Sequence, residues 1–279
     1  MGSLSRRRSC LTVPGGSEKM VRKAASLAAD EIVLDLEDGV APESKDAARS
    51  LVLDVIGEGL FGGRRIAVRV NAQGSPWQAA DLRALAPLAD KGVSVVLPKV
   101  DSAEDVKRAE DRFSGDIQAL IETASGLARC LEIAGASENM ASLIIGYGDL
   151  ASALGRSKTA DWNFVQETVL LAARVYGLQA IDGPCFDLAP NSARLVAEAA
   201  GTSAKGFDGK WAIRPLQIDA INAAFTPSAE AVSEARGLLA ALDAATASGQ
   251  GVAIFEGAMI DEAMRRGALR TIAKVEGSA

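Results

Sequence analysis

Charged side chains follow several short apolar runs of the sequence, each at the point where the run ends. Glu37 and Asp38 follow one run, Glu122 and Asp149 follow two others, and Arg69 ends a fourth. Carboxylate oxygens are ligands that Mg²⁺ accepts, usually with water in its remaining positions. A Mg²⁺ held by Glu122 and Asp149 could chelate a 2-hydroxy or 2-oxo acid and polarise its carbonyl oxygen. Arg69 could then stabilise an enolate oxygen or bind a carboxylate through two hydrogen bonds.

Other polar residues follow the remaining apolar runs and are further candidates for the same cluster. They are Asn71, Lys99, Asp182 and Arg214, together with the Pro14-Gly15 turn. A simpler interpretation is that Glu122 and Asp149 each cap the N-terminus of a following helix. The spacing alone leaves both interpretations open.

The composition excludes several kinds of site. The chain of 279 residues contains no histidine, which rules out Ser-His-Asp and Cys-His catalysis and any zinc site with histidine ligands. Cys10, Cys130 and Cys185 lie far apart, which is typical of a protein in a reducing cytoplasm rather than of a disulfide framework. The net charge of −6 argues against nucleic acid as a partner. No apolar run reaches the roughly 18 residues of a membrane span, so we expect a cytoplasmic protein with no membrane partner.

The short apolar runs recur at about the length of one strand–helix unit, which is roughly 30 residues. They cover residues 10–13, 32–36, 65–70, 93–97, 117–121, 143–147, 178–181 and 211–213. Most are nearly continuous apolar runs, as in parallel strands that are covered on both faces. With helix-length segments between them, they predict a (β/α)8 TIM barrel. The carboxyl ends of its strands would form one mouth, where barrel active sites lie.

The pattern changes after the last predicted strand. We predict a barrel domain over residues 1–225 and a C-terminal helical arm over residues 226–279. Thr226 and Pro227 suggest an N-cap and first residue of a helix. A strand-like segment at residues 252–255 and a final helix from about Asp261 follow. The arm is too small to fold as an independent domain, so we expect it to pack on the barrel or on a neighbouring subunit.

Eight short motifs occur in order along nearly the whole chain. They are LTVPG (11–15), LDLEDGV (34–40), RVN (69–71), LPKV (97–100), IETASG (121–126), GYGDL (146–150), GFDGKWAIRPLQ (206–217) and EGAMID (256–261). In these motifs the chain resembles the citrate lyase beta-subunit-like family of the HpcH/HpaI aldolase superfamily, which includes malyl-CoA and citramalyl-CoA lyases. The resemblance implies a (β/α)8 barrel, a divalent metal that is usually Mg²⁺, and reversible carbon–carbon cleavage of a 3-hydroxyacyl-CoA.

The resemblance also implies roles for individual residues. The metal ligands fall on Glu122 and Asp149, and Arg69 falls on the position that binds the substrate together with Glu122. In the CoA lyases the acid corresponding to Asp261 enters the site of a neighbouring subunit and exchanges the proton at the acyl carbon. Glu37, next to Asp38, falls on a supporting carboxylate. The alternative for Asp261 is that it caps the final helix.

Contacts with CoA are implied for Thr12, Lys19, Lys23, Lys45, Ile213 and Arg214. Two of these positions depart from the family, since Arg214 stands where relatives have histidine and Thr12 where an aromatic residue is common. Arginine binds a phosphate or carboxylate firmly but cannot act as a neutral imidazole. A different interpretation of Lys19 and Lys23, four residues apart, is a solvated helix face.

The resulting hypothesis is a Mg²⁺-dependent lyase that cleaves, or forms, a malyl-, citramalyl- or citryl-type CoA thioester. Its products would be an acyl-CoA and a 2-oxo acid. The arm implies a homo-oligomer, with a trimer favoured. Two other classes stay open: a CoA-independent aldolase acting on a 2-oxo or hydroxy acid, which the changes at Arg214 and Thr12 suggest, and a non-catalytic barrel or subunit of a larger complex.

Overall fold

The computed structural model describes residues 6–157, 160–190 and 192–276. Its contacts divide it into two compact units. The first is Arg7–Asn222, and the second comprises, among the described residues, Arg6 and residues 223–276.

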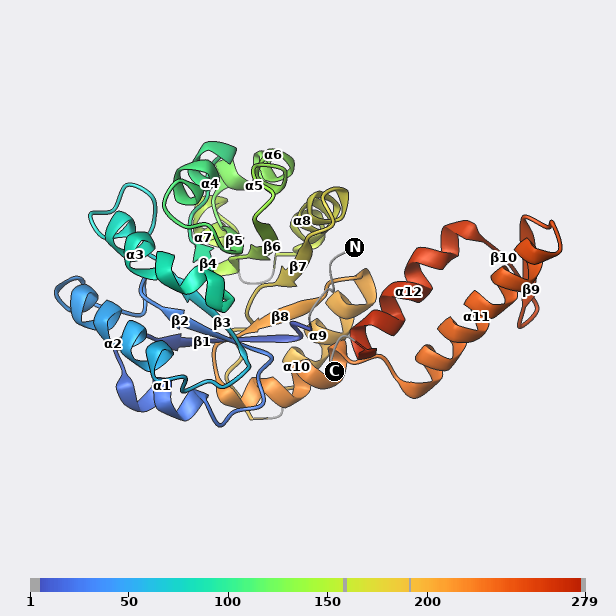
Figure 1. Cartoon of the computed structure of the whole chain (residues 1–279), viewed down its shortest axis with the longest axis horizontal. Coiled ribbons are helices and arrows are strands. Elements are labelled where there is room, and N and C mark those ends of the chain that lie inside the picture. Colours follow the sequence, from blue (N-terminus) through green and yellow to red (C-terminus); the bar gives the residue numbers. More distant parts are fainter. Residues whose placement is uncertain (1–5, 158–159, 191, 277–279) are drawn as a thin grey trace. The chain divides into compact units, whose positions relative to one another are not determined.

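Within the described residues of the first unit, strands β1 to β8 form a closed parallel barrel in sequence order, with β8 pairing back to β1 (Figure 1). The strands are β1 (Ser9–Pro14), β2 (Glu31–Asp35), β3 (Arg65–Arg69), β4 (Val93–Leu97), β5 (Ile117–Ile121), β6 (Met140–Ile145), β7 (Gln179–Asp182) and β8 (Gly209–Ala212). The predicted (β/α)8 barrel is therefore confirmed. The largest shift is at β6, because Tyr147, predicted to end this strand, already opens a helix.

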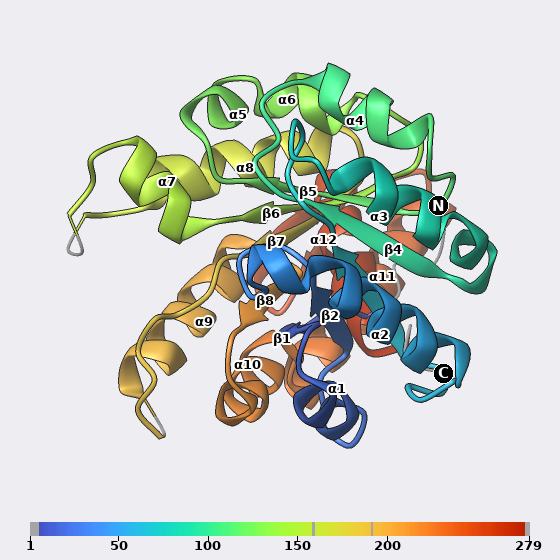
Figure 2. The same cartoon turned by 90° about the vertical axis from the view of Figure 1, so that its left-hand side faces the viewer.

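Helices and short 3-10 turns alternate with these strands, and the helices lie around the outside of the barrel (Figure 2). They are α1 (Glu18–Ala24), η1 (Pro42–Ser44), α2 (Lys45–Gly57), α3 (Gln78–Leu85), η2 (Ala86–Lys91), α4 (Ala103–Glu110), α5 (Ala124–Ala128), α6 (Cys130–Ala134), α7 (Tyr147–Ala153), α8 (Asn163–Val175), α9 (Ala193–Lys205), η3 (Pro215–Gln217) and α10 (Ile218–Phe225). On α8, Val165, Val169 and Ala172 lie at helical spacing on one face, and all three side chains are buried.

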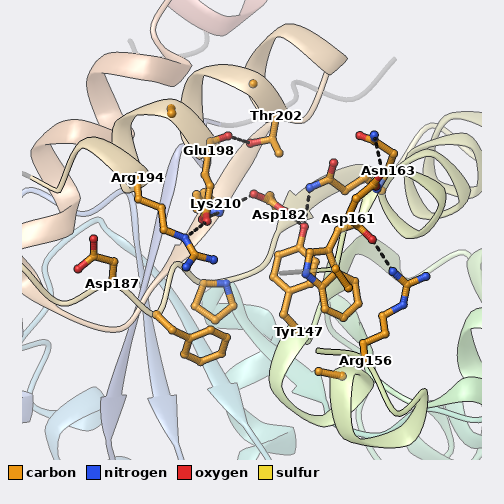
Figure 3. A pocket seen from close by; sticks show the side chains of 18 of the residues that line it. Tyr147, Arg156, Asp161, Asn163, Asp182, Asp187, Arg194, Glu198, Thr202 and Lys210 are labelled. Atoms are coloured by element: carbon orange, nitrogen blue, oxygen red, sulfur yellow. Dashed lines mark hydrogen bonds and ion pairs between the residues drawn. The ribbon is translucent and has the colours of Figure 1, made fainter. Parts of the chain in front are cut away.

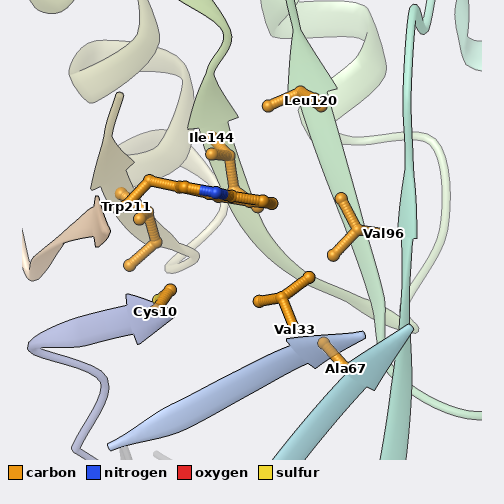
Figure 4. Close-up of a cluster of buried hydrophobic side chains, with 8 residues drawn as sticks. Cys10, Val33, Ala67, Val96, Leu120, Ile144 and Trp211 are labelled. Atoms are coloured by element: carbon orange, nitrogen blue, oxygen red, sulfur yellow. The ribbon is translucent and has the colours of Figure 1, made fainter. Parts of the chain in front are cut away.

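The interior of the barrel is arranged in layers. Its middle layer is apolar and takes one residue from each strand (Figure 4). The members are Cys10, Val33, Ala67, Val96, Leu120, Ile144, Ile181 and Trp211. Alternate residues of a strand point to the same face, so residues two positions before or after these also face the interior.

The layer on the side of the strands' amino ends, below the apolar one, is polar and buried. Arg7 donates to Glu31 Oε1 at 3.1 Å and to Gln179 Oε1 at 2.8 Å. Gln118 Nε2 donates to the same Glu31 oxygen at 3.0 Å, and Ser142 Oγ donates to Gln118 Oε1 at 2.9 Å. The layer above the apolar one contains Thr12, Asp35 and Arg69, and Glu122 follows β5 directly. This upper layer lies at the carboxyl ends of the strands, which is the mouth.

The second unit contains α11 (Ala229–Ala247), β9 (Val252–Phe255), β10 (Ala258–Asp261) and α12 (Glu262–Glu276). The strands β9 and β10 form an antiparallel hairpin that the sequence predicted only in part. Its two-residue turn, Glu256-Gly257, has φ values of 49° and 80°, as tight hairpin turns require. Helix α11 is capped by Ser228, whose Oγ accepts from the Ala231 N–H at 3.1 Å, so the predicted cap at Thr226 is wrong.

Among the described residues, no helix combines the length and the apolar composition that crossing a membrane requires.

Candidate active site

Arg69 is held at the mouth by two carboxylates. Its Nε and Nη2 donate to the two oxygens of Asp35, each at 2.7 Å, and its Nη1 lies 2.8 Å from Glu37 Oε2. Asp35 also accepts the backbone N–H groups of Glu37 at 2.8 Å and Gly39 at 2.9 Å. Burial opposes the charge of Arg69, but the hydrogen bonds and charges of these acids outweigh it and raise the pKa of the guanidinium. Arg69 is therefore a fixed positive charge at the mouth.

Asp35 was not among the predicted site residues. Its signal in the sequence is an acid within the otherwise apolar run 32–36, because an acid that such a run buries needs a partner.

Lys99, which follows β4, contacts four acids of the mouth. Its backbone N–H donates to Glu122 Oε1 at 2.9 Å, and its ammonium forms an ion pair with Glu37. The same ammonium lies 3.5 Å from Asp38 Oδ2 and 4.0 Å from Asp149 Oδ2. The residue has a left-handed backbone with φ of 52°, which is uncommon outside glycine. The sequence suggested Lys99 as a member of the site without a role.

Glu122 is buried beside Gly146, the residue that follows β6. A Cβ at position 146 would lie 2.4 Å from Glu122 Oε2 and 2.5 Å from its Cβ, so only glycine leaves room for this side chain. Burial raises the pKa of Glu122 to about 8, helped by the negative charge of Asp149 and opposed by Lys99. The ionised form of Glu122 is thus costly without a further positive charge.

Glu122 and Asp149 fit the requirements of a Mg²⁺ site. Neither acid caps a helix as the alternative supposed: the cap of α5 is Thr123, which accepts the Gly126 N–H at 2.9 Å, and Gly146 precedes α7. Asp149 instead stands in the first turn of α7 with its side chain 45% exposed. The described part of the chain has no group of three or more Cys, Asp or Glu residues placed to hold a metal ion, so these two acids would leave positions of the metal open. Two carboxylates with open positions are what Mg²⁺ accepts when it also binds a substrate.

Lys45 holds the segment that carries Glu37. Its ammonium is buried and donates to the backbone carbonyls of Leu36 at 2.8 Å and Glu37 at 2.7 Å. The structure therefore shows Lys45 positioning this segment, while its contact with CoA stays a prediction.

The other residues predicted to contact CoA have different surroundings. Lys19 and Lys23 are exposed on α1. Their exposure is compatible both with contact to CoA and with a solvated helix face. Arg214 is exposed and its Nη1 donates to the Leu188 carbonyl at 3.2 Å. Ile213 packs on the apolar layer, and the buried Oγ1 of Thr12 has no hydrogen-bond partner within the described residues.

Two further polar residues near strand ends have other partners. Asn71 Nδ2 donates to Asp81 Oδ2 at 2.7 Å in the segment after β3. Asp182 points outward, because Ile181 takes the inward position at the end of β7. Its carboxylate accepts from Lys210 Nζ at 2.6 Å and from the Tyr147 hydroxyl at 2.5 Å.

These outward-facing groups line a cavity of about 930 Å³, whose walls are residues of α7, α8 and α9 and of the loops before α8 and after β7 (Figure 3). The expectation that Asp182 converges with the other strand-end acids is therefore wrong.

Asp261, predicted to act in a neighbouring subunit, is the last residue of β10 in the second unit. Its side chain is exposed, and its Oδ1 accepts the Ala263 N–H at 3.0 Å. This hydrogen bond is the capping interaction of the alternative interpretation. Entry into a neighbouring site stays a prediction.

Comparisons with known proteins place the chain in a family. Residues 8–215 match the family model of the HpcH/HpaI aldolase/citrate lyase family. An L-malyl-CoA/beta-methylmalyl-CoA lyase of Cereibacter sphaeroides is 34% identical, over 89% of this chain and 88% of its own length. A (3S)-malyl-CoA thioesterase of the same organism is 36% identical, over 98% of this chain and 95% of its own length.

Solved structures agree with this. The protein CitE from Mycobacterium tuberculosis, in complex with magnesium, acetoacetate and coenzyme A, matches with a TM-score of 0.78 and 34% identity. The match covers 98% of this chain and 99% of that one. The chain therefore belongs to the HpcH/HpaI aldolase/citrate lyase family, which confirms the family and the enzyme class that its ordered motifs indicate.

Proposed function

We propose that the protein is a Mg²⁺-dependent carbon–carbon lyase that acts on a 3-hydroxyacyl-CoA of malyl, citramalyl or citryl type. It would cleave this thioester into an acyl-CoA and a 2-oxo acid, or form it from them. The observation that carries the proposal is the single mouth that combines Glu122, Asp149 and the fixed guanidinium of Arg69. Lyases among the relatives, and a related structure containing magnesium and coenzyme A, support it.

In this proposal Glu122 and Asp149 hold the metal. When bound, Mg²⁺ supplies a Lewis acid for the oxygens of the 2-oxo acid. Arg69, kept in place by Asp35 and Glu37, stabilises negative charge that develops on the substrate oxygen during cleavage. Because Arg69 is already oriented, its charge needs no rearrangement as the reaction proceeds.

We further propose a homotrimer in which the arm, residues 226–279, brings an acid to the mouth of the next barrel, residues 1–225. Asp261 of the partner subunit would exchange the proton at the acyl carbon. The thioester would extend along the residues implied by the family motifs, which are Thr12, Lys19, Lys23, Lys45, Ile213 and Arg214.

A second candidate function is hydrolysis of the thioester. The observation that favours it is the thioesterase relative, which matches 98% of this chain at 36% identity. A thioesterase would release a free hydroxy acid and free CoA and would leave the carbon–carbon bond intact.

One assay separates these functions. The protein is incubated with malyl-CoA, citramalyl-CoA, citryl-CoA or the free hydroxy acids, each with Mg²⁺ or with EDTA, and both 2-oxo acid and free thiol are measured. A lyase releases 2-oxo acid without free thiol, and only with Mg²⁺. Free thiol without 2-oxo acid would establish a thioesterase instead. Cleavage of a free hydroxy acid would indicate the CoA-independent aldolase, and no product at all would leave a non-catalytic barrel.

A further inference from the structure

Four carboxylates gather at the mouth around a single lysine. We call Glu37, Asp38, Glu122 and Asp149 the acid cluster; all four are contacted by Lys99, one through its backbone N–H and three through its ammonium. The side chain of Glu37 is only 6% exposed and that of Glu122 is buried, so water screens their repulsion weakly.

We propose that Lys99 is a built-in counter-ion of this cluster, which competes with Mg²⁺ for the acids and so sets the metal affinity. This inference rests on the proposed function, because it concerns the same metal site. The lysine neutralises part of the cluster when no metal is bound. The metal then has to bind against a positive charge that already stands beside Asp149.

The backbone geometry supports this role. In its left-handed conformation, Lys99 directs its N–H toward Glu122 while its side chain reaches Glu37 and Asp149. A non-glycine residue keeps such a backbone only where its surroundings hold it there. Here the surroundings are the two predicted metal ligands and the acid that contacts Arg69.

The electrostatic consequence has a definite sign. Removing a positive charge about 4 Å from a metal ligand increases the attraction between the remaining acids and any cation. The same removal leaves the acids less compensated when metal is absent. A neutral side chain at position 99 should therefore bind Mg²⁺ more tightly and be less stable without it. Replacement of a purely structural lysine would leave metal binding equal or weaker.

The test is Mg²⁺ titration of the full-length, metal-free protein by calorimetry, with Mn²⁺ binding measured by electron paramagnetic resonance as a second probe. We expect Lys99→Gln to bind Mg²⁺ roughly 3- to 10-fold more tightly than the unaltered protein, since the ammonium is partly exposed and its effect partly screened. Lys99→Arg keeps the charge and should stay within about twofold. Lys107→Gln, on the exposed surface of α4, is the matched control and should change nothing.

Thermal unfolding gives a second readout. Without metal, Lys99→Gln should unfold at a lower temperature than the unaltered protein, and saturating Mg²⁺ should close that gap. If Lys99→Gln does not fold, Lys99→Asn is used, because asparagine accepts the left-handed backbone more readily and also removes the charge. Failure of both neutral variants to fold even with Mg²⁺ would overturn the proposal.

Equal or weaker Mg²⁺ binding by Lys99→Gln, beside normal binding by the unaltered protein, would also overturn it while leaving the proposed metal site intact. By contrast, if the unaltered protein and Glu122→Gln show the same negligible Mg²⁺ binding, the proposed metal site itself fails. The two failures are thus distinguishable.

Discussion

Asp35 and Arg69 are direct neighbours in the pairing of β2 with β3, and their side chains meet in a two-point salt bridge above the apolar layer. The orientation of Arg69 is consequently set by the barrel strands themselves. Sites built on strands hold their groups more closely than sites built on loops. The same carboxylate also anchors the N–H groups of Glu37 and Gly39, so one buried acid organises both the guanidinium and the following loop.

Replacing Arg69 with lysine should strongly reduce turnover. An ammonium cannot contact both oxygens of Asp35 and also Glu37 in one plane, so the charge at the mouth would shift. We expect kcat/KM for the cleaved thioester to fall by about 100-fold or more, as for loss of an oxyanion donor. Near-ultraviolet circular dichroism would check that the barrel is retained, and Arg108→Lys on the exposed side of α4 is the control. Turnover close to normal would contradict the assigned role.

Glu122→Gln and Asp149→Asn should each abolish turnover and leave the barrel folded. Each change removes a negative charge at nearly constant volume, so packing should survive. Because loss of a group that merely supports a metal ligand already costs about 10- to 100-fold in affinity, we expect at least that loss of Mg²⁺ binding in calorimetry. Full Mg²⁺ affinity in either variant would remove that residue from the metal site.

Gly146→Ala should damage the metal site from outside it. The added Cβ would overlap Glu122 Oε2 and force the carboxylate to move, so Mg²⁺ affinity should fall by about 10-fold or more. Gly148→Ala, two residues further along in α7, is the matched control, since its Cβ would meet only the Phe186 ring at an ordinary 3.6 Å. Equal Mg²⁺ affinities of the two variants would show that Glu122 does not depend on this space.

The pH dependence follows from Glu122, whose pKa in the metal-free protein is raised from 4.5 to about 8. Below that pH the metal must displace a proton, so Mg²⁺ affinity should rise with pH and level off above about pH 8.

The metal-free protein should show the opposite trend in stability. Between pH 4.5 and about 8 the folded chain holds a proton that the unfolded chain has released, so its free energy of unfolding falls as pH rises. Calorimetric titrations and thermal melts across this range would measure both trends. Glu122→Gln should lack this contribution to each, and an unchanged pH dependence in that variant would assign the effect to another group.

Mixing experiments test the role of Asp261. Asp261→Asn and Glu122→Gln subunits should each be inactive alone. Refolded together, they should form mixed oligomers in which some sites combine an intact metal pair with an intact Asp261 of the partner subunit. Activity should therefore return in part. No recovery in oligomers shown to be mixed would mean that Asp261 acts within its own chain or only caps α12, as its hydrogen bond to Ala263 allows.

The barrel could be predicted because most of its strands are nearly continuous apolar runs. For the same reason, the sequence did not show whether the side chain at the end of each strand points into the barrel or out of it. Glu122 and Asp182 both stand at strand ends, yet Glu122 belongs to the mouth and Asp182 faces α8 and α9 outside the barrel. An apolar run carries no alternation that would tell these cases apart.

The sequence also could not predict where long side chains make their contacts or which residues adopt an unusual backbone conformation. Lys45 resembles a surface lysine in a charged segment, but folding buries its ammonium against two carbonyls. The contacts of Lys99 depend on a left-handed backbone that a Pro-Lys-Val segment does not predict. In the second unit, β10 was missed because four residues before a helix carry too little periodicity to indicate a strand.

The apolar layer, to which each of the eight strands contributes one residue, limits which molecules can pass along the barrel axis. Its packed side chains close the barrel axis. Neither ions nor a chain of water molecules can cross a packed apolar layer of this kind. In the proposed lyase, protons would therefore enter and leave through the mouth, as the substrate and products would.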